Sequence, residues 1–384
     1  MTTTKTTKSL IWDLPTRVFH WLLLASYVLA WISYDDNRFL FVHVFAGYVF
    51  FCLLGFRLIW GLIGTRYARF HSFAHDWSSV GEYLKGLLTG QAMRYIGHNP
   101  IGGQAIFAML ALGLLVSITG MLVLAGEEGH GPLKGLIGYS TGIASHRIHE
   151  ILAWSMLGLT AVHVIGVIVE SVFHKENLIW SMISGHKEDA AGEPGVRGHH
   201  YLGLLIIIIV IVSTLLYFRG YMQETSDHLY QPYQGPVLPD NTTWREACSE
   251  CHFTFHPSLL PARSWQKLFD NQHEHFGDDL DLEAATLAEL LKFHLDNAAE
   301  QGLTEFARKI LYYTPENKTP IRITETVYWK KKHADIDPVY WRHETVKFKG
   351  NCDVCHLDAK QGTYEDSDMR LPTLDKAPEE KQQP

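Results

Sequence analysis

The chain has 384 residues, of which 47% are hydrophobic, and a formal net charge of −8 at pH 7. This negative charge argues against nucleic acid as a partner, because nucleic acids are bound by basic surfaces. The average composition conceals two parts: about the first 220 residues are apolar, as in a membrane protein, whereas the remainder is polar, as in a water-soluble domain.

Five apolar stretches are each near the length of about 20 residues that a helix needs to cross a bilayer. They cover residues 16–35, 39–63, 103–125, 146–171 and 200–218. Lys and Arg gather at the N-terminus and after the second and fourth stretches, but not in the connectors 35–38 and 126–135. The positive-inside rule therefore predicts a multi-pass protein of the bacterial inner membrane, with a cytoplasmic N-terminus and a periplasmic C-terminal part. We expect the first helix to act as an uncleaved signal.

The predicted fold class is all-α, in three parts. Residues 1–185 form a transmembrane four-helix bundle, residues 186–220 a cytoplasmic linker and a fifth anchoring helix, and residues 221–384 a mostly helical, loop-rich periplasmic domain. Residues 283–300 have the apolar spacing of an amphipathic helix. The charged, Pro-containing end of the chain predicts a disordered tail, and the spans show no pattern of buried carboxylates typical of a proton relay.

Four histidines lie inside the first, second and fourth stretches: His20, His43, His149 and His163. His149 and His163 are 14 residues apart, so on one helix they lie within about 40° of the same face and about 21 Å apart along the axis. Since successive helices run in opposite directions, matched depths pair His43 with His149 on the outer side and His20 with His163 on the inner side. Such polar side chains are costly in a membrane, and paired imidazoles there suit haem iron.

Other readings of these histidines stay open. A single intramembrane histidine can simply hydrogen-bond a neighbouring helix, and His146 competes with His149 as the ligand on the fourth stretch. Histidines in loops or at span ends are expected to be solvated or interfacial: His71, His75, His98, His130, His174, His186, His199 and His200.

Four of the five cysteines fall in two Cys-x-x-Cys-His motifs, Cys248 to His252 and Cys352 to His356. In this motif two thiols, here Cys248 with Cys251 and Cys352 with Cys355, attach a c-type haem, and the histidine binds its iron. A zinc site or disulfides are the alternatives, but neither requires a histidine directly after the second cysteine. The fifth cysteine, Cys52, is expected to be a small apolar side chain.

Each haem c iron needs a second axial ligand. The candidates in the C-terminal part are six histidines and one methionine: His256, His273, His275, His294, His333, His343 and Met369.

Residues 10–185 resemble the prokaryotic cytochrome b561 group, which includes the cytochrome b subunits of nickel-iron hydrogenases. The motifs that carry the resemblance are WDLPTRVFHW at 12–21, the segment 43–70 beginning HVFAGYVFF, and HRIHEILAW at 146–154. The resemblance implies two haem b groups on the four histidines and electron exchange between quinone and a partner protein. Arg17 and Arg57 are candidates for contacts with haem propionates, although lipid phosphate would suit them equally well.

Residues 240–372 resemble the bacterial dihaem cytochrome c family. ACSECHFTFHPSLLPARSW, HFG at 275–277, TPIRITETVYW and NCDVCHLDAKQGTY carry this resemblance. It implies that His275 and His333 are the distal ligands of the two c haems. The fusion of the two families through a fifth helix departs from both.

Together these features predict a four-haem electron conduit, with two haem b and two haem c groups, between quinol and a soluble periplasmic redox protein. No acid, base or nucleophile is assigned; any enzymatic activity is expected to be quinol dehydrogenation. One alternative is a periplasm-facing haem enzyme acting on oxygen, superoxide or a nitrogen oxide. Another is a redox-sensing or docking subunit.

Overall fold

The computed structural model describes residues 8–35, 39–188, 195–221, 238–302, 304–362 and 364–374. Helices dominate these residues, which confirms the predicted fold class. The chain divides into two compact units: Met1–Val123 with Ala144–Tyr217, and Leu124–Ile143 with Phe218–Pro384. The predicted C-terminal tail lies outside the described residues, as does the middle of the linker.

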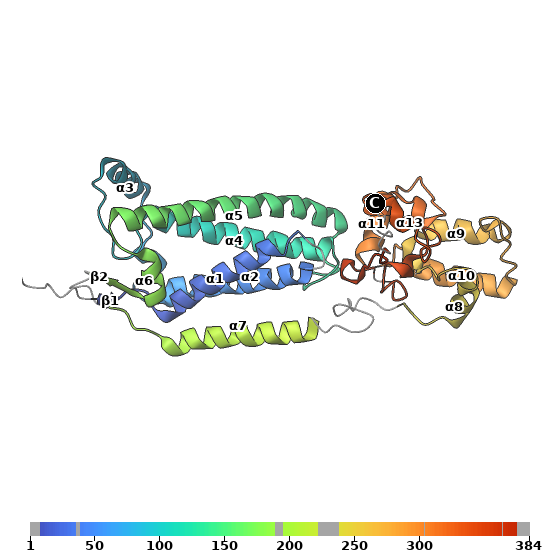
Figure 1. The fold of residues 1–384 in the computed structure, drawn as a ribbon, viewed down its shortest axis with the longest axis horizontal. Helices are drawn as coiled ribbons and strands as arrows, with labels where there is room; N and C mark the ends of the chain where they lie inside the picture. Colours follow the sequence, from blue (N-terminus) through green and yellow to red (C-terminus); the bar gives the residue numbers. More distant parts are fainter. Residues whose placement is uncertain are drawn as a thin grey trace, which may run out of the picture. The chain divides into compact units, whose positions relative to one another are not determined.

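Long helices form most of the first unit: α1 (Leu14–Ile32), α2 (Leu40–Ile63), α4 (Pro100–Gly126), α5 (Tyr139–Phe173) and α7 (His200–Tyr221). Figure 1 shows α1, α2, α4 and α5 side by side as a bundle. Phe50 and Leu54 of α2, Leu110 of α4 and Met156 of α5 form its buried apolar core. These helices match the predicted stretches to within a few residues, except that α5 begins seven residues earlier, at Tyr139.

Within the described residues, α2, α4, α5 and α7 are long and apolar enough to cross a membrane. Only 6% of the most apolar part of α5 is buried, so most of its surface suits hydrocarbon. Helix α1 is not among the four, because its first turns contain Thr16, Arg17 and His20. Its 19 residues are about 28 Å long, close to the roughly 30 Å of a hydrocarbon core, so its crossing stays a prediction.

Helix α7 packs along α2. At one end the Tyr217 hydroxyl donates to the Phe41 carbonyl over 2.9 Å, and the Tyr217 ring stacks on Phe45 at 4.5 Å. Before the other end of α7, His199 contacts Trp60 at 5.4 Å. The end of α7 therefore lies beside the start of α2 and its start beside the end of α2, so the two helices are antiparallel.

Short elements close one end of the bundle: β1 (Lys8–Leu10), α3 (Trp77–Thr89), α6 (Leu178–Ser184), β2 (His186–Glu188) and the 3-10 turn η2 (Phe70–Ser72). Strands β1 and β2 pair antiparallel, with Leu10 opposite His186. Buried Asp13 caps α1 by accepting from the Thr16 amide over 2.9 Å, and it also accepts from Trp60 Nε1 and the Thr65 hydroxyl. The start of α1 is therefore fixed to the end of α2.

In the second unit, short helices alternate with 3-10 turns: α8 (Thr242–Ser249), η3 (Pro257–Leu259), α9 (Ala262–Asp270), η4 (Gln272–Glu274), α10 (Ala284–Asp296), α11 (Glu305–Tyr313), η5 (Ile323–Glu325), α12 (Val327–Lys332), α13 (Pro338–Trp341), η6 (Cys352–Val354) and η7 (Asp366–Asp368). The predicted amphipathic helix is α10, which ends four residues early. Trp244, Trp265, Phe269 and Phe293 form the main core.

Candidate functional site

His43 of α2 and His149 of α5 face each other, with ring centres 6.2 Å apart and ring planes at 81°. His43 Nδ1 lies 2.9 Å from the Ala30 carbonyl, and His149 Nδ1 lies 3.0 Å from the Val116 carbonyl. A proton on each Nδ1 is thereby donated to backbone, which leaves each Nε2 with a lone pair.

This spacing fits one shared metal. A metal–imidazole bond is about 2 Å long and the nitrogen lies about 1 Å from the ring centre, so two imidazoles on one metal have centres about 6 Å apart. Hydrogen bonding of the second ring nitrogen is the usual way in which a ligand histidine is oriented. A haem iron takes two such ligands, since the porphyrin supplies the other four.

The inner histidines, His20 of α1 and His163 of α5, lie within range of direct electrostatic interaction. Nδ1 of His20 is buried and has no hydrogen-bond partner among the described residues. The structure thus brings His43 and His149 together as expected from depth, and the interaction between His20 and His163 is consistent with the second expected pair.

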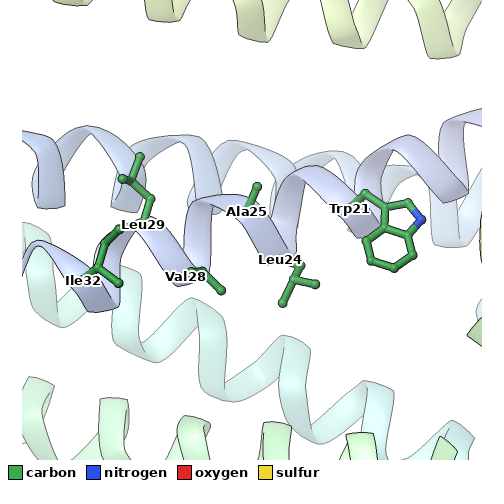
Figure 2. Close-up of a pocket in the computed structure, with 6 residues that line it drawn as sticks. All are labelled: Trp21, Leu24, Ala25, Val28, Leu29 and Ile32. Atoms are coloured by element: carbon green, nitrogen blue, oxygen red, sulfur yellow. The ribbon is translucent and has the colours of Figure 1, made fainter.

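Along one face of α1 runs a shallow apolar groove of about 540 Å³ (Figure 2). Its lining consists of Trp21, Leu24, Ala25, Val28, Leu29 and Ile32. Since these side chains offer almost no polar surface, the groove suits a hydrocarbon chain and lacks the donors that would orient a polar head group.

Both candidate arginines lie at the closed end of the bundle. Arg57 is only 4% exposed, its guanidinium lies 4.9 Å from the Phe70 ring centre, and its Nη1 has no hydrogen-bond partner among the described residues. Arg17 donates to the Ile183 carbonyl over 2.5 Å, while its Nε is buried without a partner among the described residues. A buried cation with an unused donor is a fitting contact for a haem carboxylate.

In the second unit, His252 and His275 have ring centres 6.3 Å apart and planes at 26°. His275 is placed by a tight turn in which its amide donates to the Asp278 carbonyl over 2.7 Å. Phe276 (φ 58°) and Gly277 (φ 105°) at the centre of the turn both have positive φ. Arg322 lies 4.0 Å above the Phe276 ring and holds the strained residue in place.

His333 and His356 form the second such pair, with ring centres 6.2 Å apart and planes at 66°. His333 Nδ1 lies 2.8 Å from the Trp329 carbonyl, and its ring stacks on Trp329 at 4.3 Å. Burial lowers the pKa of His333 to about 4, so the ring is neutral at pH 7 and able to bind a metal.

None of the five cysteines forms a disulfide. Burial raises the pKa of Cys248 to about 11 and that of Cys352 to about 12. Within the described residues no group of three or more His, Cys, Asp or Glu side chains is arranged to hold a metal ion by itself. Haem attachment at the two motifs stays the prediction made from the sequence.

The other candidate ligands have different environments. His256 caps η3 through Ser258, and His294 is buried between Trp265 and Phe269. His273 is exposed and pairs with Asp279 at 2.9 Å, and His343 Nδ1 lies 2.8 Å from the Thr345 hydroxyl. The Met369 side chain is 39% exposed.

One polar cluster at the closed end of the bundle was not expected from the sequence. The Tyr83 hydroxyl of α3 donates to Glu170 Oε2 of α5 over 2.7 Å, and His174 Nε2 lies 3.4 Å from Glu170 Oε1. The sequence predicts no pattern of buried carboxylates in the spans, but the last turns of α5 do contain a mostly buried carboxyl group, Glu170. The spacing of seven residues from His163 to Glu170 was the available signal.

Residues 11–185 match the family model of prokaryotic cytochrome b561, and residues 244–364 match that of dihaem cytochrome c. Among curated relatives is the probable Ni/Fe-hydrogenase B-type cytochrome subunit of Rhodobacter capsulatus, 26% identical over 210 residues, or 46% of this chain and 80% of the relative. Another with this description, from Azotobacter chroococcum mcd 1, is 28% identical over 219 residues, or 47% and 89%.

Two solved structures match about a third of this chain. The dihaem cytochrome c from Rhodobacter sphaeroides is 32% identical, covering 33% of this chain and 99% of that chain, with a TM-score of 0.30. The dihaem cytochrome c from Shewanella baltica OS155 is 24% identical, covering 35% and 94%, with a TM-score of 0.29.

Proposed function

We propose that this chain carries electrons from membrane quinol to a periplasmic redox protein. Residues 11–185 belong to the prokaryotic cytochrome b561 family and residues 244–364 to the dihaem cytochrome c family, so the chain is an electron-transfer cytochrome. The observation that carries the proposal is the recurrence of one imidazole spacing. Three histidine pairs in two unrelated folds have ring centres 6.2 to 6.3 Å apart, the separation expected for two axial ligands on one iron.

The proposed ligands form four pairs: His43 with His149 and His20 with His163 for the two b haems, and His252 with His275 and His356 with His333 for the two c haems. Cys248 with Cys251, and Cys352 with Cys355, would attach the c haems covalently. A bound haem supplies reversible one-electron chemistry at its iron. The chain holds both axial positions and fixes ring orientation through the Nδ1 contacts of His43, His149 and His333.

Buried arginines would set the electrostatics of the inner b site. Arg57 and Arg17 lie at the end of the bundle where α1 begins, which is also the end that holds His20, and each has an unused, buried nitrogen donor. We assign them to the propionates of the inner haem, whose negative charge would offset the cost of burying Arg57.

The proposed direction and surroundings follow from the orientation predicted by basic residues. Quinol would be oxidised near the inner haem, and electrons would leave from the c haems to a soluble acceptor. The curated relatives are described as hydrogenase cytochrome subunits. In this chain the fused dihaem unit would itself occupy the position between the b haems and an external partner.

Purified protein in detergent should show four low-spin haems, two of type b and two of type c, by the pyridine haemochrome assay. None should bind carbon monoxide, and a quinol should reduce both types. Replacing His275 or His333 with Ala should open one c haem to carbon monoxide, whereas His343→Ala should not. A wild-type haem that binds the gas would favour the small-molecule enzyme, and failure of quinol to reduce any haem would rule out quinol as the donor.

A further inference from the structure

At the closed end of the bundle, Glu170 belongs to a cluster of protonatable groups that no haem site uses. We name Tyr83, Asn99, Glu170 and His174 the carboxyl cluster. The Tyr83 hydroxyl donates to Glu170 Oε2 over 2.7 Å, and Asn99 Nδ2 donates to the Tyr83 oxygen over 3.3 Å. His174 Nε2 lies 3.4 Å from Glu170 Oε1, and both side chains are only slightly exposed, at 11% and 13%.

The carboxyl cluster lies directly below the proposed inner haem ligand. Glu170 follows His163 by seven residues on the same helix, so it lies within about 20° of the same face and about 10.5 Å further along the axis. His149, fourteen residues before His163, shares this face. One side of α5 thus presents the two proposed ligands and then, two turns later, a carboxyl group.

A neighbouring glutamate shows what is particular to Glu170. Glu176 is also 13% exposed, but its carboxylate is held by Arg94 at 3.2 Å and by Lys187 at 3.9 Å. Those two cations offset the charge of the Glu176 carboxylate. The direct contacts of Glu170 are a hydroxyl and an imidazole, and Lys187 acts on it only as a more distant charge.

Tyr83 supplies a fixed donor to this carboxyl group. Burial and the neighbouring Glu170 carboxylate raise the pKa of Tyr83 above its ordinary value, so the hydroxyl keeps its proton. The amide of Asn99 occupies the Tyr83 oxygen as acceptor, which directs the hydroxyl proton toward Glu170. Because Glu170 Oε2 already accepts from Tyr83, the other oxygen, Oε1, is the one that can accept a further proton, and it faces His174.

We propose that Glu170, oriented by Tyr83 and relayed by His174, accepts the protons released when quinol is oxidised beside the inner haem. This inference rests on the proposed function. Oxidation of one quinol to quinone releases two electrons and two protons. A haem held by His20 and His163 would take up these electrons one at a time and would pass them on to the haem held by His43 and His149. Each proton goes to Glu170 Oε1, then to His174 and to water, so the carboxylate is restored before the next transfer.

The test compares Glu170→Gln with Glu176→Gln in the full-length protein, two changes of equal size at the same end of α5. Stopped-flow reduction of the b haems by a short-chain ubiquinol should slow by about tenfold or more in Glu170→Gln, as expected for loss of a proton acceptor. Glu176→Gln should keep the wild-type rate. Dithionite reduces haem without any quinol proton having to be removed, so it should reduce all three proteins equally fast. Their haem content and midpoint potentials should be unchanged.

Four results would overturn the inference. Glu170→Gln reduced by quinol at the wild-type rate excludes a role in proton transfer, and lost haem b or shifted potentials would mean that the cluster only supports the fold. Should that variant fail to accumulate, Tyr83→Phe removes the donor and keeps the ring, and a wild-type quinol rate would then be decisive. Wild-type protein that dithionite reduces and quinol does not would remove the proposed donor, and the inference with it.

Discussion

Gly120 of α4 shows how one residue controls the outer histidine pair. A Cβ atom at this position would lie 3.1 Å from His149 Cε1, closer than nearly all real contacts of that kind. The nearby Val116 carbonyl and Thr119 hydroxyl contact Nδ1 of the same ring. The absence of a side chain at 120 therefore lets α4 approach and orient His149.

Replacing Gly120 with Val should displace the His149 ring and abolish the outer haem site. We expect the haem b content to fall by about half relative to haem c in the pyridine haemochrome assay. The matched control is Gly158→Val on α5. Gly158 has open space around it and lies nine residues from His149, on the opposite side of the helix. Full haem b content in Gly120→Val would contradict the proposed role of His149.

His294 predicts a pH dependence for the second unit. It is 2% exposed, its Nδ1 lies 2.7 Å from the Leu290 carbonyl, and burial lowers its pKa from 6.5 to about 4. The unfolded chain therefore binds this proton more tightly than the folded chain. The stabilisation is complete above pH 6.5 and is lost as pH falls toward 4, at up to about 1.4 kcal/mol per pH unit.

Thermal unfolding of the whole protein, followed by circular dichroism of the haem c absorption, should show a falling melting temperature between pH 6.5 and 4. His294→Gln should flatten that dependence, although its melting temperature at pH 7 should be lower because the core is less well packed. His273→Gln changes an exposed histidine and should keep the wild-type slope. An unchanged slope in His294→Gln would show that another group is responsible.

Among the structural elements, the Phe276–Gly277 turn carries backbone strain close to a proposed ligand. Phe276 has φ 58° and Gly277 has φ 105°, and nothing lies within 4 Å of a Cβ atom built on Gly277. Any cost of a side chain there is thus conformational rather than steric. The turn aims His275 at His252, so the strain contributes to positioning.

Gly277→Ala should destabilise the second unit by about 1–2 kcal/mol, the ordinary cost of a positive φ for an L-residue. It should also let a fraction of one c haem bind carbon monoxide, because His275 is held less firmly. Gly81→Ala, in helix α3 and also in open space, should cost nothing and gives the comparison. A fully stable Gly277→Ala variant that binds no carbon monoxide would show that the turn does not position His275.

For the whole molecule, the side of the membrane that the second unit occupies depends on helix α1. With α1 crossing, five spans place residues after 221 on the side opposite the N-terminus; without it, four spans return them to the same side. Attachment of c-type haem is expected outside the cytoplasm, which favours five.

Reporter fusions would decide this. Alkaline phosphatase, which is active only after export, should be inactive when fused after residue 188 and active when fused after residue 240. Green fluorescent protein should give the reverse pattern. Phosphatase activity after residue 188 but not after residue 240 is the result expected from four spans and a cytoplasmic N-terminus, and it would exclude the predicted arrangement, as would activity at both positions or at neither.

Much of the fold could be predicted because long apolar helices and Cys-x-x-Cys-His motifs are local signals. The pairing of His43 with His149 also followed from sequence, since depth along antiparallel helices is simple geometry. Contacts between distant segments could not be predicted. Helix α3, with Tyr83 on Glu170, and Arg322 above Phe276 depend on loops whose path no periodicity fixes. The pairing of β1 with β2 could not be predicted for the same reason.

That pairing places the first and last segments of the cytochrome b unit beside each other, with Lys8 opposite Glu188. A module whose ends meet can be extended at either end, or opened at a loop and rejoined, without moving its interior. Helix α7 begins twelve residues after β2, at His200, so the chain continues from a point where the two ends of the bundle segment already meet. We therefore expect that another electron acceptor could be fused in place of the dihaem unit without disturbing the bundle.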